Sequence, residues 1–205
     1  VLDGEGGGRA ITWEDAVGWQ PAKDGEVLWL HICRTRDGVQ EWLERDLAVP
    51  EPTAELLTSD QTRPRAFREG NTLVGTLRGI NFNPGAEPED MISMQFWSDG
   101  HRLVTLRRHP LQTPREVLAQ IDRGVGPVDA GATITLLAEY MIARMSQSIV
   151  DMNDVLDELE HDDPEEHAEA MLPLETAALD ALRERHLVYG KVSVLGSVAT
   201  AVAEQ

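Results

Sequence analysis

The chain has 205 residues, 41% of them apolar, which is enough to build a hydrophobic core and excludes disorder throughout. Its 36 Asp and Glu residues outnumber its 18 Lys and Arg residues, so the formal net charge is −18. A surface this negative repels phosphate backbones and attracts cations, which argues against nucleic acid as a partner.

Cys33 is the single cysteine, so no intrachain disulfide can form and a reducing compartment is the natural setting. It ends an apolar run, Val27–Cys33, that predicts a buried strand and a buried, unreactive thiol rather than a nucleophile. The first residues show no signal-peptide pattern. The nearest approach to a membrane span, Leu187–Ala203, is interrupted by Lys191 and by glycines. We therefore expect a water-soluble polypeptide.

Two short helices are predicted next. Asp37 is placed to cap a helix over 38–47, in which apolar residues recur at helical spacing. Pro50 and Pro52 then restart the chain before a second short helix over 53–58.

From residue 63 to 108 the pattern changes to strands. Gly70-Asn71 and Asp99-Gly100 are signals for tight turns, and a longer loop covers 83–90. Strands joined in this way form an antiparallel meander, with helices on at least one face. A helix over 114–123 closes this part. The expected strands cover 66–68, 72–83, 91–97 and 102–107.

Helical periodicity dominates after residue 127. A long helix is predicted over 130–160, with a length of about 45 Å. A second helix begins at Pro164 and runs toward Tyr189, so that the two form an antiparallel hairpin. We divide the chain into an α/β subdomain, residues 1–125, and a helical part, residues 126–205, which carries most of the net negative charge. The apolar stripe of the first helix consists of Ile134, Leu137, Met141, Met145, Ile149, Met152, Leu156 and Leu159.

The densest group of possible metal ligands lies at the tip of the predicted hairpin. Its carboxylate oxygens and imidazole nitrogens could hold a divalent cation such as Zn²⁺ or Mg²⁺. The spacing lacks the His-Glu-x-x-His pattern that fixes ligands on one helical face, and it disfavours a metal-dependent hydrolase. A specific site and a solvated acidic tip that attracts cations diffusely both stay open. The candidate metal ligands are His161, Asp162, Asp163, Glu165, Glu166 and His167.

Other polar residues have a structural and a functional interpretation. His31, on an apolar strand, is expected to be a hydrogen-bonded core histidine rather than a base or a ligand. Arg107-Arg108-His109 ends a predicted strand and could bind an anion, but we favour protection of an edge strand by positive charge. Nothing in the chain forms a nucleophile motif or a nucleotide-binding motif. We therefore expect that the chain is not an enzyme and that it binds no cofactor firmly.

The most specific motif of the chain is Leu77–Met91, which contains the loop Asn-Pro-Gly-Ala-Glu-Pro-Glu-Asp. Together with Leu28-Trp29-Leu30-His31 and Val39-Gln40-Glu41-Trp42-Leu43, it resembles the ZntB zinc-transport branch of the CorA-type metal-ion transporters. The resemblance covers roughly residues 1–160.

This resemblance implies an α/β/α sandwich with a mixed, mainly antiparallel sheet, followed by a long helical hairpin. It also implies a homopentamer at the cytoplasmic face of the bacterial inner membrane. The family's Gly-Met-Asn signature and its two membrane spans have no counterpart in this sequence, so the expectation is a soluble portion of a longer transporter.

Two functions follow as hypotheses. The first is the cytoplasmic funnel domain of a transporter of divalent cations, with zinc expected, which serves pentamer assembly, cation accumulation and gating. The second is a free-standing, acidic, metal-responsive module or protein-interaction module, whose acidic hairpin binds a basic partner.

Overall fold

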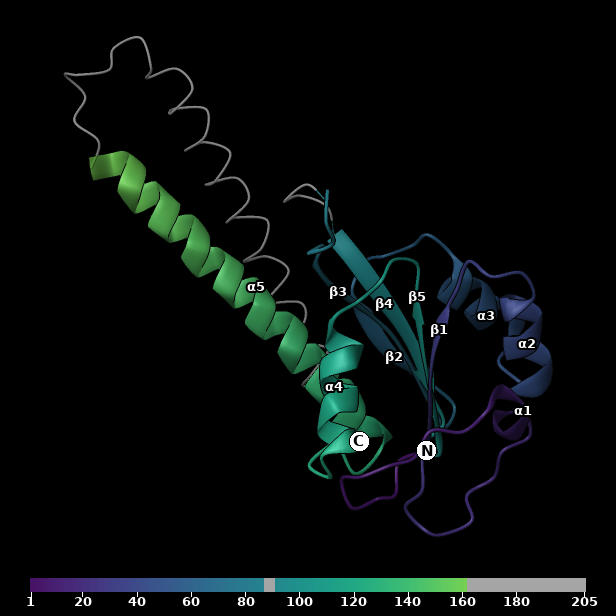
Figure 1. Cartoon of the computed structure of the whole chain (residues 1–205). Coiled ribbons are helices and arrows are strands. Elements are labelled where there is room, and N and C mark those ends of the chain that lie inside the picture. Colours follow the sequence, from purple (N-terminus) through teal and green to yellow (C-terminus); the bar gives the residue numbers. More distant parts are fainter. Residues whose placement is uncertain (87–90, 162–205) are drawn as a thin grey trace.

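Five strands form one mixed sheet in the order β1-β5-β4-β3-β2 (Figure 1). The structure, a computed structural model, describes residues 1–86 and 91–161. β2 to β5 follow one another as an antiparallel meander, and β1 pairs with β5 in parallel. The strands are β1 (Leu28–Cys33), β2 (Arg65–Glu69), β3 (Thr72–Ile80), β4 (Met91–Ser98) and β5 (Arg102–Arg107).

The predicted antiparallel meander is confirmed. Hydrogen bonds from local side chains set the ends of its strands. At the β4–β5 turn the carboxylate of Asp99 accepts hydrogen bonds from the backbone N–H groups of His101 and Arg102, at 3.0 and 2.7 Å. β3 ends three residues before the predicted end. The reason is that the side-chain oxygen of Asn81 accepts a hydrogen bond from the backbone N–H of Asn83, which turns the chain out of the sheet.

Helices cover both faces of the sheet, which confirms the predicted α/β/α sandwich (Figure 1). α2 (Val39–Asp46) and α3 (Glu51–Thr58) cover one face, where Leu43 and Leu57 pack against Trp97 and Val104. The other face carries α4 (Thr113–Asp122) and α5 (Ala130–His161). The core on that side contains Leu77, Met94, Phe96, Leu103, Val117, Ile121, Ile134, Leu137, Met141 and Met145.

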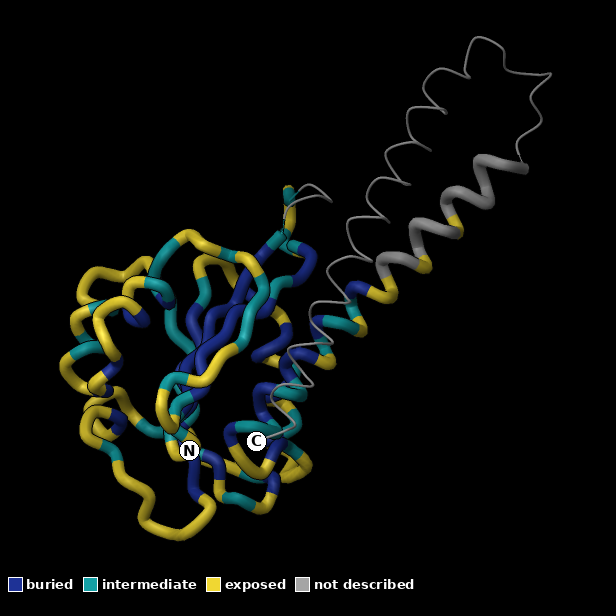
Figure 2. The backbone as a smooth tube through the Cα atoms, turned by 180° about the vertical axis from the view of Figure 1, so that it is seen from behind, coloured by how far each residue is buried: buried dark blue, intermediate teal, exposed yellow. Residues whose placement is uncertain are grey.

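α5 spans 32 residues, a length of about 48 Å, and confirms the predicted long helix. Ile134, Leu137, Met141 and Met145 recur at three- and four-residue intervals, and all are buried. Figure 2 shows the buried residues of α5 on the part beside the sheet, and Figure 1 shows the helix continuing beyond it. The first half of α5 is therefore part of the same core as the sheet.

One glycine of β3 makes room for an aromatic ring. An added Cβ at Gly75 would overlap the ring of Phe96 and lie 2.9 Å from the backbone oxygen of Arg65. At Gly79, four residues further along the strand, an added Cβ would meet only the terminal methyl of Met141, at 2.9 Å. The first obstacle is a fully buried ring beside rigid backbone, whereas the second is the end of a flexible side chain.

We expect Gly75→Ala to lower the free energy of unfolding by about 1–3 kcal/mol, because the buried ring cannot move without disturbing the core. The matched control Gly79→Ala is expected to change it by less than about 1 kcal/mol. Urea denaturation of both variants measures the difference. Equal losses would mean that Phe96 does not occupy the space above Gly75.

Two predictions for this region are wrong. The strand predicted to be buried, β1, lies at an edge of the sheet, and only Leu28 within it is fully buried. The α2 helix begins at Val39 after Gly38, whose φ of 79° is a left-handed conformation, and no side chain caps it. Asp37 is therefore not its N-cap, because the chain enters the helix through a glycine turn.

Several predictions fall outside the described residues. These are the second helix from Pro164 toward Tyr189, the hairpin that it would form and the segment after Gly190. The division into parts 1–125 and 126–205 also stays a prediction.

Candidate functional site

The structure does not describe the side chains of the predicted metal ligands. His161 is the last residue of α5, and its side chain is not described. The other candidates, Asp162, Asp163, Glu165, Glu166 and His167, lie outside the described residues. Among the side chains that the structure describes, no three of His, Cys, Asp or Glu come together in a way that could hold a metal ion. The acidic metal cluster stays a prediction.

The best defined candidate feature is the junction at which α5 leaves the sandwich. Asp129 starts the helix, because its carboxylate accepts a hydrogen bond from the backbone N–H of Ala132 at 2.6 Å. From Ala130 to Met145 one side of the helix is buried against the sheet and α4. Past this point α5 extends outward from the sandwich (Figure 1).

Polar contacts hold α5 at the junction. Arg144 pairs with Glu116 of α4, and the side chain of Gln120 donates a hydrogen bond to the hydroxyl of Tyr140. The guanidinium of Arg144 also lies 5.8 Å from the centre of the Phe82 ring, in the segment after β3. Arg144 thus links the long helix both to α4 and to the end of β3.

The junction encloses almost no free space. The cavity between the end of β3, the segment before α4 and α5 has a volume of about 20 Å³, roughly that of one water molecule. A hydrogen bond of 3.1 Å from the side-chain amide of Asn83 to the carbonyl of Pro110 closes it on one side. The junction is therefore closely packed and leaves no room for a ligand.

A double-mutant cycle on Glu116→Ala and Arg144→Ala is expected to give a coupling energy below about 1 kcal/mol, because both side chains are partly exposed to solvent. Arg144→Ala alone should cost more than Glu116→Ala, because it also removes the contact with Phe82. Denaturation of the two single variants and the double variant measures both quantities. A coupling above about 2 kcal/mol would show that this ion pair, rather than apolar packing, holds α5 to the sandwich.

The charged residues of the outer part of α5 are all acidic. Between Met145 and His161 its sequence contains no Lys or Arg. Its carboxylates are Asp151, Asp154, Asp157, Glu158 and Glu160. This half of the helix therefore carries a run of negative charge away from the sandwich core.

His31 has the hydrogen bond expected of it, but it is half-buried on the edge strand β1 rather than in the core. Its Nδ1 lies 2.9 Å from the hydroxyl of Thr105, which donates to the carbonyl of Leu30 and accepts from the indole N–H of Trp29. Burial, helped by the nearby positive charge of Arg107, lowers the pKa of His31 to about 4. The imidazole is therefore neutral at neutral pH.

Two further predictions for this region are wrong. Cys33 is half-exposed rather than buried, because it lies on the edge strand β1. A hydrogen bond with Thr35 lowers the pKa of its thiol, with smaller contributions from Arg107 and Arg36. The positive charges at the end of β5 do not protect an edge either, because β5 lies between β1 and β4.

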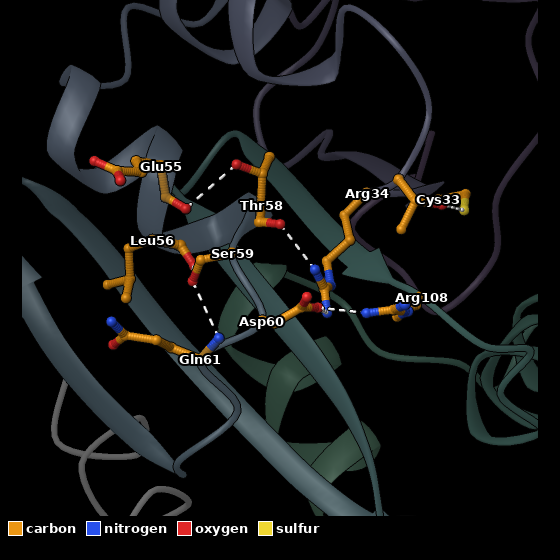
Figure 3. A network of polar contacts seen from close by, with 10 residues as sticks. Cys33, Arg34, Glu55, Leu56, Thr58, Ser59, Asp60, Gln61 and Arg108 are labelled. Atoms are coloured by element: carbon orange, nitrogen blue, oxygen red, sulfur yellow. Dashed lines mark hydrogen bonds and ion pairs between the residues drawn. The ribbon is translucent and has the colours of Figure 1, made fainter.

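A buried arginine is a structural feature that the sequence analysis missed. Arg34 donates hydrogen bonds to the carbonyl of Thr58 and to Asp60, both at 2.8 Å, and Asp60 also pairs with Arg108 at 2.7 Å (Figure 3). The two guanidinium groups lower the pKa of the Asp60 carboxyl. This network joins the ends of α3, β1 and β5, and no local pattern around Arg34 indicates it.

The first helix, α1 (Trp13–Ala16), was also missed, although a signal for it exists. The hydroxyl of Thr12 accepts a hydrogen bond from the backbone N–H of Asp15 at 3.2 Å, and Thr-x-x-Asp is a capping pattern. α1 places the ring of Trp13 against that of Trp42 in α2, with 5.2 Å between the ring centres.

Comparison with known families assigns this architecture. The family model described as "CorA-like Mg2+ transporter protein" matches residues 24–183, which is well over half of the chain. The chain belongs to the CorA family. The resemblance stated from the sequence is confirmed, and because the family is one of transporters, membership agrees with the expectation that the chain is not an enzyme.

Relatives within the CorA family include the protein described as "Divalent cation transporter CmaX" from Pseudomonas aeruginosa. It is 37% identical over 161 residues, which cover 78% of this chain and 48% of CmaX. The solved structure of full-length CmaX has a TM-score of 0.75 and 27% identity, and the match covers 99% of this chain and 76% of that one. The "Zinc transport protein ZntB" of Pectobacterium atrosepticum is 30% identical over 161 residues, 78% of this chain and 48% of that protein.

The fold is that of a ZntB cytoplasmic domain. The crystal structure of that domain from Vibrio parahaemolyticus has a TM-score of 0.63 at 18% identity, and the match covers 86% of this chain and 87% of that one. The chain spans about half the length of the curated CorA-family relatives that it matches. Of the helices that the structure describes, none combines the length and the apolar character needed to cross a bilayer.

Proposed function

We propose that this chain is the cytoplasmic part of a transporter of divalent cations and that it works as a homopentamer at the bacterial inner membrane. The observation that carries the proposal is α5, which is anchored in the sandwich core by its first half and carries only negative charge in its outer half. Membership of the CorA family and the printed activities of CmaX and ZntB support it.

The physical role follows from the charge. Five copies of the outer half of α5 around one axis would create a strongly negative vestibule, which raises the local concentration of divalent cations. Screening over about 8 Å at physiological salt limits the effect to the space between the helices. Carboxylates are suitable ligands for Zn²⁺ and Mg²⁺, and the predicted acidic tip at His161 to His167 would add to the same field.

The ion that we propose is zinc. ZntB relatives are described as zinc transport proteins, whereas CmaX is described as a transporter of divalent cations. Gating would operate through the junction, because α5 is held there by Arg144, Glu116 and Tyr140 while its outer end projects away.

The test uses the full-length protein in lipid vesicles. Zn²⁺ influx, followed with an internal fluorescent chelator, is expected to exceed Mg²⁺ influx. Light scattering of the detergent-solubilised protein is expected to give five copies. A monomer or dimer, or a reading frame without apolar spans after Gln205, would overturn the transporter assignment. Faster Mg²⁺ influx would overturn only the choice of ion.

A pair of charge variants tests the vestibule. Neutralising the five carboxylates between residues 151 and 160 is expected to lower Zn²⁺ influx several-fold at low salt and much less at high salt. The matched control neutralises five exposed carboxylates of the sandwich and should leave influx near the starting value. An equal effect of both variants would show that net charge, and not its place on α5, matters. The control residues are Glu14, Asp24, Glu41, Glu51 and Asp122.

A further inference from the structure

A cleft of about 490 Å³ opens beside the edge strand β1, between that strand, α1 and α2. This volume falls within the usual range for sites that bind small molecules. Its walls include His31 and Cys33 of β1, Arg107 at the end of β5, Arg36 in the turn before α2, and the two neighbouring indoles, Trp13 and Trp42. Neither the proposed transport function nor the junction of α5 uses this cleft.

The cleft is cationic on a chain that is otherwise strongly anionic. Arg36 and Arg107 are not in any ion pair within the described part of the chain, whereas Arg34, Arg102 and Arg144 are. One carboxylate, that of Asp37, also lines the cleft. Two unpaired guanidinium groups beside a single carboxylate leave a surplus of positive charge, and Arg is the side chain best suited to bind a planar anion.

The charges of both arginines reach the groups inside the cleft. Arg107 contributes to the lowered pKa of His31 and, together with Arg36, to that of the Cys33 thiol. His31 is neutral at neutral pH, so it adds no charge of its own. An anion in the cleft would therefore be attracted by Arg36 and Arg107.

Aromatic side chains also line the cleft. The ring of Trp13 is inclined at 49° to that of Trp42, and Trp13 is 49% exposed although it is a large apolar side chain. The indole N–H of Trp42 is buried and has no acceptor among the described residues. A flat ligand ring could cover Trp13, as aromatic rings do in ligand pockets.

We propose that this cleft binds small aromatic anions, with the carboxylate or sulfonate held by Arg36 and Arg107 and the ring packed against Trp13. The anionic group and the flat apolar body are both required, because the two arginines recognise only the first and the indole ring only the second. This proposal is independent of the ion-transport assignment.

Cys33 provides a reporter inside the cleft, because it is the single cysteine in the sequence. Its thiolate displaces iodide from either iodoacetate, which is an anion, or iodoacetamide, which is neutral. The ratio of the two alkylation rates measures the local potential, and the same chain in urea gives the reference ratio. We expect the folded protein to favour iodoacetate several-fold over that reference.

The double variant Arg36→Gln/Arg107→Gln is expected to bring the ratio back to the reference. The matched control Arg115→Gln/Arg123→Gln, at exposed positions on and after α4, should keep it high. Circular dichroism checks that both variants are folded. If the folded protein has a ratio at or below the reference, or if both variants behave alike, the cationic cleft is refuted.

Protection of Cys33 tests binding itself. Naphthalene-2-sulfonate is expected to slow the reaction with iodoacetamide in a saturable way, and Trp13→Ala should weaken this protection. The neutral 2-naphthalenemethanol and inorganic phosphate, at the same concentrations, should protect much less. Equal protection by phosphate would overturn the aromatic requirement, and no protection by the sulfonate would overturn the site.

Discussion

Replacing Leu137 by alanine is expected to lower the free energy of unfolding by about 3–5 kcal/mol, the largest single effect that we foresee. Leu137 lies in the first half of α5, is fully buried, and belongs to the core that α5 shares with the sheet. The substitution removes apolar contacts and leaves a cavity between a helix and a sheet, neither of which can close the gap easily.

The control for this prediction is Leu118→Ala on α4. Leu118 is 51% exposed, so the same chemical change should cost less than about 1 kcal/mol. Urea denaturation of the chain, followed by circular dichroism, measures both values. Similar losses at the two positions would mean that α5 is not packed on the sheet, and the packed junction that we describe would then not exist.

The second large effect concerns pH and His31. The pKa of His31 is about 4 in the folded chain, against 6.5 in an unfolded one, because partial burial and the nearby charge of Arg107 both disfavour the protonated ring. Between these two values the unfolded state binds a proton that the folded state does not. The free energy of unfolding therefore falls as the pH drops from 6.5 to 4, by about 1.4 kcal/mol per pH unit and about 3 kcal/mol in all.

His31→Gln is expected to remove this slope. Because carboxylates also titrate in the lower part of the range, the informative quantity is the difference between the original chain and the variant at each pH. That difference should be constant above pH 6.5 and should change steadily below it. His101→Gln, in the exposed β4–β5 turn, is the matched control and should follow the original chain. If the curve of His31→Gln also ran parallel to that of the original chain, the folded protein would not hold the imidazole in its neutral form.

Much of the fold could be predicted because it depends on local signals. The Asp99-Gly100 pair marks the β4–β5 turn, and its carboxylate caps that turn in the structure. The apolar spacing of α5 depends only on helical geometry, and the buried side chains from Ile134 to Met145 follow it. The strand pattern alone predicted helices on at least one face of the sheet. The resemblance to the CorA-type transporters added the prediction of helices on both faces.

Apart from the start of α2 and the missed helix α1, which are local, the errors occur where distant segments meet. Cys33 and β1 were predicted to be buried because the sequence there is apolar. The sequence does not show that β1 is an edge strand, with no strand paired to its outer side in the described part of the chain. The parallel pairing of β1 with β5 and the Arg34–Asp60–Arg108 network join residues far apart in sequence. The cleft beside β1 was missed for the same reason, because its two arginines come from different parts of the chain.

The parallel pairing at the edge of the sheet also has a consequence for synthesis on the ribosome. β1 is the first strand to be made, yet its partner in β5 is 74 positions later, as the contact of His31 with Thr105 shows. β2 to β5 can pair in order as they emerge, because each partner is the next strand. We expect the nascent chain to close this hairpin series first and to recruit its earliest strand last, so β1 would be the final strand to join the sheet.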